Sequence, residues 1–196
     1  MKKTGTRISN FVFFFVLLFF ASIVSAADIE TYEVDPVHST AFFKVGHYGF
    51  GFVRGGFTDI SGNIVIDKAH STKSTVDIVI KTESINTENN QRDEHLKSKD
   101  FFDVAEFPIM YFKSREIKKQ SKNLYEVAGE FTLHGITKKI TVPVKFIGEG
   151  KDHYGAYRAG FETQFSINRS EYGMTKYIPA AGDTVAITLV IEGIRK

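Results

Sequence analysis

The chain of 196 residues carries 25 Lys and Arg against 23 Asp and Glu, and it contains no Cys and no Trp. The missing Cys excludes disulfides, thiol catalysis and Cys-ligated metal sites. The near-neutral balance leaves no overall electrostatic footprint for nucleic acid or for an anionic membrane surface.

Residues 1–26 have the three-part layout of a cleavable secretory signal peptide. A basic start precedes an apolar run over 11–20, and small residues follow. The run is shorter than the roughly 18 apolar residues that a spanning helix needs, so an uncleaved anchor is the weaker alternative. We therefore expect cleavage after Ala26 or Ala27, a single mature domain over 27–196, export to the periplasm and no integral membrane segment.

Period-two alternation of apolar and polar residues dominates the mature chain and predicts β-strands. One example is the face shared by Ala41, Phe43, Val45 and His47, with Lys44 opposite. About eight strands with one buried face each predict an all-β domain, either a closed barrel or a sandwich. The clearest alternating runs lie over 41–47, 76–81, 110–114, 126–133, 139–146, 159–167 and 185–192.

Glycine-rich pairs and triplets predict the breaks between these runs. Pro143 lies inside a strand pattern, which predicts an edge position or a bulge, because proline has no amide hydrogen for a sheet ladder. The predicted breaks are Gly55-Gly56, Ser61-Gly62-Asn63, His134-Gly135, Gly148 to Gly150 and Gly182-Asp183.

One stretch does not alternate, and it predicts a short surface helix over about residues 88–97. Thr87 is the expected N-cap, with Glu88 near the positive end of the helix and Lys97 near the other end. Leu96 is the strongly apolar residue of this stretch, so we expect it to pin the C-terminal end to the domain.

The mature chain is rich in aromatic residues, with 13 Phe and 8 Tyr, and its 22 basic and 23 acidic residues leave a net charge of −1. Rings of this volume fill a core or line a cavity, and small barrels can enclose one apolar ligand. Alternation does not distinguish a solid core from a lined cavity. The inward Phe residues are Phe43, Phe57, Phe112, Phe131, Phe146, Phe161 and Phe165.

Catalytic motifs are scarce, because the chain has no Gly-rich phosphate loop, no Gly-x-Ser-x-Gly elbow and no His-Glu-x-x-His pair. Two local groups still merit attention. Arg92, Asp93 and His95 form either a polar clamp for a head group or a hydrogen-bonded cap, and the cap is the stronger interpretation. His47, on an apolar face, is either a satisfied core residue or a hydrogen-bond donor to a ligand at the barrel mouth.

Three segments give the chain its resemblance to the YceI-like family of polyisoprenoid-binding proteins. They are Val34 to His47, Arg92 to Asp103 with Phe107-Pro108, and Gly129 to Thr137, supported by Ile167 to Arg169 before Tyr172 to Met174. The resemblance implies an extended, lipocalin-like, eight-stranded antiparallel barrel with a helix near one opening. It also implies a long apolar tunnel for a polyprenyl, ubiquinone-like or other long-chain lipid, a periplasmic address and a homodimer as a candidate assembly.

On this basis we expect a binding or carrier protein that is not an enzyme, with no catalytic residue, no cofactor, no metal and no nucleic-acid partner. The alternatives are an envelope protein with a filled core and a structural or stress-response role, and, less favoured, a small-molecule enzyme using His47 or His95. The expected head-group residues are His47, Arg92, Asp93, His95 and Arg169. The expected tunnel lining is Phe43, Val45, Phe57, Ile78, Ile80, Met110, Phe112, Phe131, Leu133, Val144, Phe146, Phe161, Phe165, Ile187 and Leu189.

Overall fold

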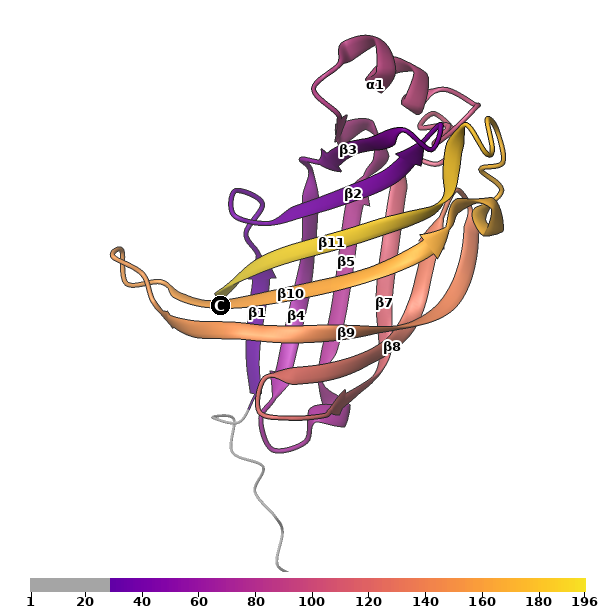
Figure 1. Cartoon of the computed structure of the whole chain (residues 1–196). Coiled ribbons are helices and arrows are strands. Elements are labelled where there is room, and N and C mark those ends of the chain that lie inside the picture. The colour runs from indigo at the N-terminus through magenta and orange to yellow at the C-terminus, as the bar shows by residue number, and fades with distance from the viewer. Residues whose placement is uncertain (1–28) are drawn as a thin grey trace, which may run out of the picture.

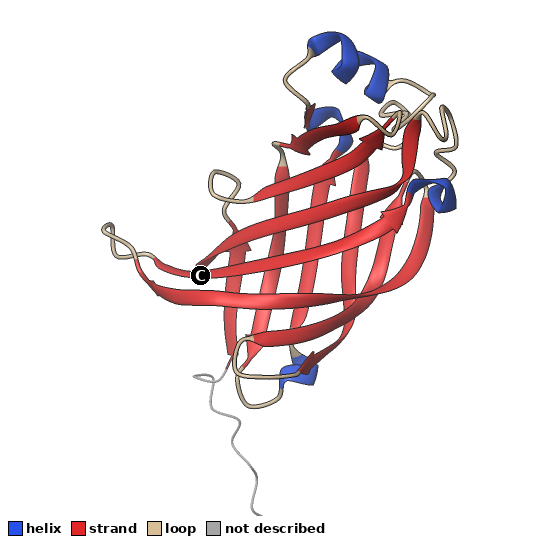
Figure 2. Cartoon of the chain, viewed as in Figure 1, coloured by secondary structure: helices blue, strands red, loops and turns tan. Residues whose placement is uncertain are grey.

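The computed structural model describes residues 29–196, which form a β-structure with one short α-helix (Figures 1 and 2). The helix α1 spans Asn90–Lys97, and three 3-10 turns lie at η2 (Ser71–Lys73), η3 (Thr82–Ser84) and η4 (Arg169–Tyr172). The strands are β1 (Ile29–Val34), β2 (Thr40–His47), β3 (Gly51–Phe57), β4 (Ile60–Asp67), β5 (Thr75–Lys81), β6 (Ile85–Asn86), β7 (Ile109–Lys119), β8 (Leu124–Leu133), β9 (Ile136–Lys151), β10 (Tyr157–Asn168) and β11 (Ala181–Arg195).

Eight strands close into an antiparallel barrel in the order β1-β4-β5-β7-β8-β9-β10-β11, and the pairing of β1 with β11 completes the ring. The predicted eight-stranded barrel is therefore confirmed. The strands β2, β3 and β6 continue the same sheet outward from β11. The sheet consequently extends past the ring at the end where α1 lies (Figure 1).

Strand β11 is long enough to serve two partners along one side. Its first part pairs with β2 from Ala181↔His47 to Val190↔Thr40, and its end pairs with β1 from Gly193↔Val34 to Arg195↔Tyr32. The strands β1 and β2 thus follow one another along β11, separated by the turn over 35–39.

The alternating faces confirm the predicted strand pattern. In β8, Val127, Gly129, Phe131 and Leu133 are buried. Glu126, on the opposite face, is exposed, although it pairs with Lys118 of β7 and Pro143 of β9. Side chains on successive strand residues point to opposite faces, so the apolar positions of every alternating run reach the inside of the barrel.

Four of the predicted breaks are wrong, because Gly55-Gly56, Ser61-Gly62-Asn63, Gly148 to Gly150 and Gly182-Asp183 all lie within strands. Close packing explains two of these glycines. A Cβ on Gly55 would lie 2.7 Å from the Phe43 ring, and a Cβ on Gly62 would overlap the Asp77 carbonyl oxygen.

The turn at His134-Gly135 is confirmed. It joins β8 to β9 with two residues at φ +51° and +72°, the backbone that a two-residue hairpin turn favours. Pro143 is also explained, because the pairing of β9 with β10 ends at Val144↔Thr163. Pro143 therefore lies just beyond the part of β9 that pairs with β10, and it still pairs with Glu126 of β8.

The helix begins two residues later than predicted. Asn89 is the N-cap and accepts a hydrogen bond from Arg92 N at 2.9 Å, so the expected cap at Thr87 is wrong. The physical reason is Glu88, whose φ of +62° is incompatible with a helix. Leu96 packs against the core, as expected.

The predicted signal peptide lies outside the described residues. Within 29–196, no helix has the length and apolar character required to cross a bilayer.

Candidate binding cavity

A cavity of about 1130 Å³ runs inside the barrel. Its wall includes Phe101 and Tyr177 at the α1 end, and Lys122 and Asn123 from the turn between β7 and β8. The volume exceeds the roughly 300–1,000 Å³ of common small-molecule sites. The interior of this barrel is therefore hollow, and the filled-core alternative does not describe it.

Every residue predicted to line a tunnel lies in the wall of this cavity. They come from alternate positions of β2, β3, β5, β7, β8, β9, β10 and β11, which is why one face of each strand supplies them. That these side chains contact a ligand stays a prediction. The set is Phe43, Val45, Phe57, Ile78, Ile80, Met110, Phe112, Phe131, Leu133, Val144, Phe146, Phe161, Phe165, Ile187 and Leu189.

Aromatic pairs stiffen the wall. Phe43 contacts Phe57 with a ring-centroid distance of 6.1 Å, and Phe146 contacts Phe161 at 5.6 Å. Phe57 also meets Phe102 edge-on at 5.4 Å, which ties the loop after α1 to the barrel. Tilted and edge-on contacts of this kind are favourable geometries for aromatic rings.

At the α1 end, His95, Phe101 and Tyr177 lie in the cavity wall within a cluster of aromatic and polar side chains. His95 lies edge-on to Phe101 and to Tyr177, and these two rings stack at 5.8 Å. The Asp100 carboxylate lies 3.2 Å from His95 Nε2 and accepts a hydrogen bond from the Tyr177 hydroxyl. The contact with His95, and then that with Tyr177, lowers the pKa of Asp100.

Two of the expected head-group residues are tied to Thr87. Arg92 lies in the cavity wall, but its Nε donates to Thr87 Oγ1 and its Nη2 to Thr87 O, each at 2.7 Å. Asp93 is buried outside the cavity wall and accepts from the backbone and side chain of Thr87. Asp93 thus locks the start of α1 to the segment after β6, as the capping interpretation expects.

Arg169 is a buried structural residue of the wall, only 5 % exposed. Its guanidinium donates four hydrogen bonds to backbone oxygens of Met174, Lys176, Ala181 and Gly182, at 2.6–2.9 Å. Burial lowers the pKa of Arg169. The side chain therefore holds the loop between η4 and β11 in place.

His47 is exposed at the end of β2, lies in the cavity wall and meets the Tyr48 ring edge-on at 4.7 Å. In residues 29–196, no hydroxyl group is hydrogen-bonded to the ring of His47 or of His95. His95 Nε2 instead contacts the Asp100 carboxylate. Both histidines lie in the cavity wall, and their contact with a ligand head group stays a prediction.

Sequence reasoning missed the polar groups deeper in the wall and at its opposite end. Lys119, Lys122 and Tyr125 line the cavity near the β7–β8 turn, and the basic run over 118–122 was the available signal. Thr163 shares the inward face of β10, and its buried Oγ1 has no hydrogen-bond partner among the described residues. A polar atom of a ligand can use this hydroxyl.

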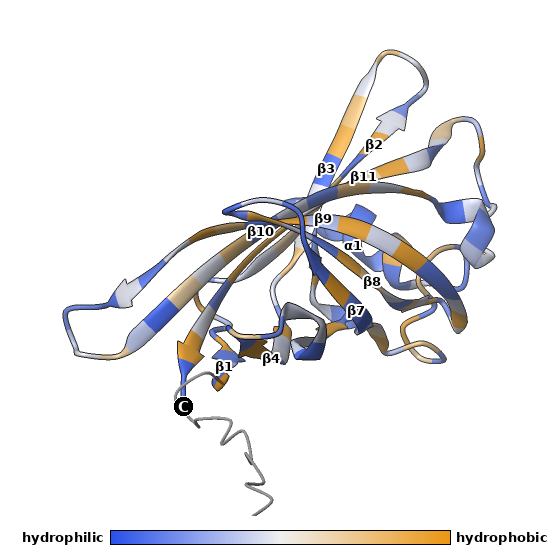
Figure 3. Ribbon diagram, turned by 90° about the horizontal axis from the view of Figure 1, so that it is seen from below, coloured by the Kyte–Doolittle hydropathy of each residue, from blue (hydrophilic) through white to orange (hydrophobic). Residues whose placement is uncertain are grey.

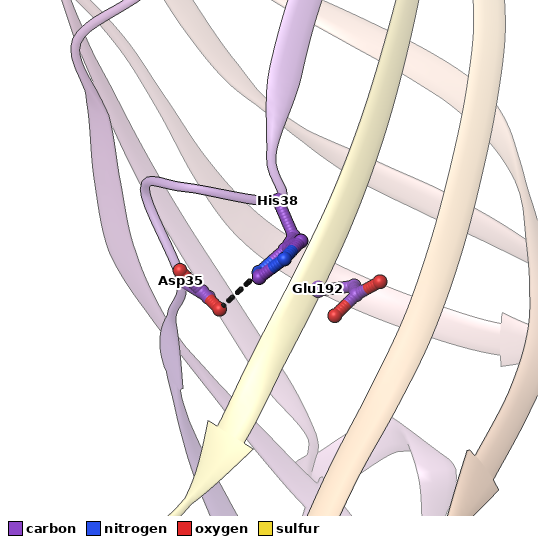
Figure 4. A group of neighbouring side chains, drawn as sticks. All are labelled: Asp35, His38 and Glu192. Carbon is purple, nitrogen blue, oxygen red and sulfur yellow. Dashed lines mark hydrogen bonds and ion pairs between the residues drawn. The ribbon is translucent and has the colours of Figure 1, made fainter. Parts of the chain in front are cut away.

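A separate cluster of polar side chains lies near the junction of β1, β10 and β11. Asp35, His38 and Glu192 place atoms of the kind that can ligate a metal within 4.8 Å of one another (Figure 4). Arg158 Nη1 donates to the carboxylates of both Asp35 and Glu192. Burial alone raises the pKa of Asp35, but the bonds from Arg158 and His38 hold it well below its ordinary range. The guanidinium thus supplies the positive charge at this group.

The comparisons with known proteins agree on one family. The family model described as the YceI-like domain matches residues 32–193. A UPF0312 protein of Pseudomonas fluorescens is 38% identical over 182 residues, covering 89% of this chain and 90% of the relative. A UPF0312 protein of Yersinia enterocolitica is 36% identical over 181 residues, covering 91% and 92%.

Solved structures share the fold. Burkholderia cenocepacia BcnA superposes with a TM-score of 0.73 at 23% identity, covering 81% of this chain and 98% of that one. The Campylobacter jejuni YCEI protein gives 0.67 at 29% identity, covering 74% and 85%. A polyisoprenoid binding domain from Saccharophagus degradans, implicated in plant cell wall breakdown, gives 0.65 at 17% identity, covering 84% and 98%.

Proposed function

The chain belongs to the YceI-like family, and from this premise we propose that it binds a long-chain isoprenoid or similar amphiphile inside its barrel. The observation that carries the proposal is the cavity of about 1130 Å³ walled by aromatic and aliphatic side chains. A compact polar metabolite would leave most of this apolar wall in contact with water. A long hydrocarbon tail matches both its chemistry and its extent along the barrel.

The expected affinity comes mainly from the tail. Each buried methylene contributes about 0.8 kcal/mol, so a five-carbon isoprene unit contributes about 4 kcal/mol before ordering is subtracted. The solved polyisoprenoid binding domain of Saccharophagus degradans supports this ligand class. The similarity to it is one of fold.

We place the polar head at the α1 end, where His47, Arg92 and His95 lie in the wall. Asp93 and Arg169 hold the surrounding backbone at this end, because the polar atoms of Asp93 are bonded to Thr87 and those of Arg169 to the loop over 173–180. The orientation places the apolar tail along the Phe-rich part of the cavity.

The compartment proposed for this activity is the periplasm. It rests on the signal-peptide layout of residues 1–26, with cleavage after Ala26 or Ala27. A carrier in that compartment would keep a water-insoluble lipid apart from solvent between membranes. Homodimerisation is part of the same proposal and is measurable by sedimentation of the purified mature protein.

Native mass spectrometry provides the test. The mature protein is delipidated and offered undecaprenyl phosphate, ubiquinone and a long-chain fatty amide separately. The expected result is a one-to-one complex with at least one long-tailed probe, and no complex with its short-tailed analogue. A folded, delipidated protein that retains none of the three overturns the proposal.

A further inference from the structure

The hairpin formed by β2 and β3 exposes aromatic side chains at its tip. Tyr48 is 59 %, Phe50 92 % and Phe52 62 % exposed, and the rings of Tyr48 and Phe50 stack at 6.3 Å. Figure 3 shows this hairpin extending away from the barrel wall. Large aromatic rings in such positions are costly in water and mark interaction surfaces.

The same hairpin is locally basic. Residues 40–57 contain Lys44 and Arg54 but no Asp or Glu, and these two residues are direct partners across the hairpin. Neither has a carboxylate within 4.0 Å among residues 29–196. Lys44 Nζ instead lies 3.8 Å from the centre of the Phe52 ring. The hairpin is therefore positively charged, although the whole chain has a net charge near zero.

The aromatic tip is continuous with the cavity wall at the α1 end. His47, Tyr48 and Phe52 belong to the cavity wall, and Tyr48 N donates to Ala180 O at 2.7 Å. The neighbouring loop adds Tyr177, which is 52 % exposed and also lines the cavity. We call Lys44, Tyr48, Phe50, Phe52 and Arg54 the hairpin patch.

We propose that the hairpin patch docks this protein onto the surface of an anionic phospholipid bilayer, with the α1 end of the cavity facing the membrane. Aromatic rings favour the headgroup level of a bilayer, and lysine and arginine beside them are attracted to anionic lipids. A second copy of the chain fits the patch less well, because symmetric pairing would bring the uncompensated Lys44 and Arg54 of both copies together.

Docking can be tested apart from ligand binding at Lys44, Phe50 and Arg54, because these three residues of the patch lie outside the cavity wall, whereas Tyr48 and Phe52 belong to it. Its consequence for a carrier is direct: a lipid would pass between bilayer and cavity beside the patch without crossing open water. The patch thus assigns the face through which exchange takes place.

Vesicle co-sedimentation tests the proposal with the full mature protein. Binding is expected to phosphatidylcholine–phosphatidylglycerol vesicles, to weaken with added salt and to be much lower on phosphatidylcholine alone. Phe50→Ser should reduce the partition at least several-fold, and Lys44→Gln or Arg54→Gln should each reduce it about fivefold. Tyr154→Ser is the matched control, because Tyr154 is 94 % exposed at the β9–β10 turn and should leave the partition unchanged.

Two results would overturn docking. One is a partition that Phe50→Ser and Tyr154→Ser change equally. The other is a wild-type protein that ignores anionic vesicles but sediments as a dimer, which Phe50→Ser converts to a monomer, since the patch would then bind a second copy. Thermal unfolding confirms that each variant is folded, and native mass spectrometry of its lipid complex separates a docking failure from a failure of ligand binding.

Discussion

The Ser39 hydroxyl is hydrogen-bonded to both the backbone amide and the backbone carbonyl of Glu192. The Ser39 Oγ accepts from Glu192 N at 3.0 Å and donates to Glu192 O at 3.2 Å, and Asp35 N donates to the same oxygen at 2.8 Å. Strand β1 ends at Val34 and β2 begins at Thr40, so Glu192 of β11 lies between the two strands that pair with β11 on this side. The Ser39 hydroxyl therefore provides the Glu192 backbone with hydrogen bonds that a neighbouring strand would otherwise supply. The side chain of Ser39 closes the seam between the ring and the outer hairpin.

Ser39→Ala should therefore lower the free energy of unfolding by about 1–3 kcal/mol, because it leaves the Glu192 amide without a partner beside a residue that is 2 % exposed. Urea unfolding followed by circular dichroism measures the change. Thr184→Ala is the control, since within the described part of the chain that exposed hydroxyl bonds only to the Asn168 side chain, and a change within about 0.5 kcal/mol is expected. Equal effects of the two variants would contradict the role assigned to Ser39.

Asp35 should make the stability of the fold depend on acid. Burial works against its ionisation, but the bonds from Arg158, His38 and the Val37 amide outweigh burial and hold the pKa of Asp35 well below its ordinary 3.8. The ionised form therefore stabilises the folded state above the unfolded pKa, and this contribution is lost as the pH falls from about 4 toward the folded pKa. Asp35→Asn removes it at neutral pH, at a cost of about 2–3 kcal/mol.

The measurement is the difference in unfolding free energy between wild type and Asp35→Asn as a function of pH. The difference should be constant from about pH 5 to pH 8 and shrink below about pH 4. Glu106→Gln, at an exposed carboxylate, should track the wild type throughout. If the difference in unfolding free energy between wild type and Asp35→Asn grew as the pH fell, ionised Asp35 would not be stabilising the folded state.

The barrel could be predicted because alternation records which side chains share a face, and seven runs were clean enough to recognise. The strands β1 and β3 were harder. In β1 the inward positions include Glu30, 9 % exposed and bonded to Arg195 and Tyr32, so a charge interrupts the apolar pattern. In β3 the glycine at 55 makes room for the Phe43 ring, a requirement that only the folded neighbour reveals.

The same limit applies to the cavity. Alternation identified the inward residues, but whether they meet or leave a space depends on the closure of eight strands, which no local pattern contains. The role of Arg169 was equally hidden, because two of its backbone acceptors, Met174 and Lys176, lie in a loop with no regular pattern. Thr163 could have been singled out as the one hydroxyl on the apolar face of β10, and its significance appears only with its lack of a partner among residues 29–196.

Filling the cavity should block long tails without unfolding the protein. Ile187 lies in the wall beside Phe43 and Phe165, and Ile187→Trp adds an aromatic ring to the space that the tail would occupy. We expect at least a tenfold loss of affinity for a long-tailed probe and a smaller loss for a shorter one, measured by competition in native mass spectrometry. Ala186→Trp is the matched control, one residue away on the exposed outer face. Equal affinities of the two variants would argue against an internal tail.

Arg169→Lys should loosen the loop between η4 and β11 although it preserves the charge. A lysine has one nitrogen and no planar fork, so it does not reach four separate backbone oxygens as Arg169 does. The expected loss is about 3 kcal/mol of unfolding free energy, with faster hydrogen exchange over 174–182. Arg115→Lys, at an exposed pair with Glu130, should leave both readouts nearly unchanged. Unaltered exchange over 174–182 in Arg169→Lys would contradict the anchoring role.

His47 provides the sharpest test of where the polar head of the ligand lies. It is exposed, lies in the cavity wall and makes no side-chain hydrogen bond that its removal would break among the described residues. His47→Ala should weaken binding of a quinone or polyprenyl phosphate roughly threefold to tenfold, the effect of one lost hydrogen bond, and leave binding of a head-less hydrocarbon such as squalene unchanged. His153→Ala, at the exposed β9–β10 turn, should alter neither. If His47→Ala weakens both ligand types equally, the residue acts through the wall and not on the head. If it abolishes turnover of a bound lipid while affinity is retained, the enzymatic alternative replaces simple binding.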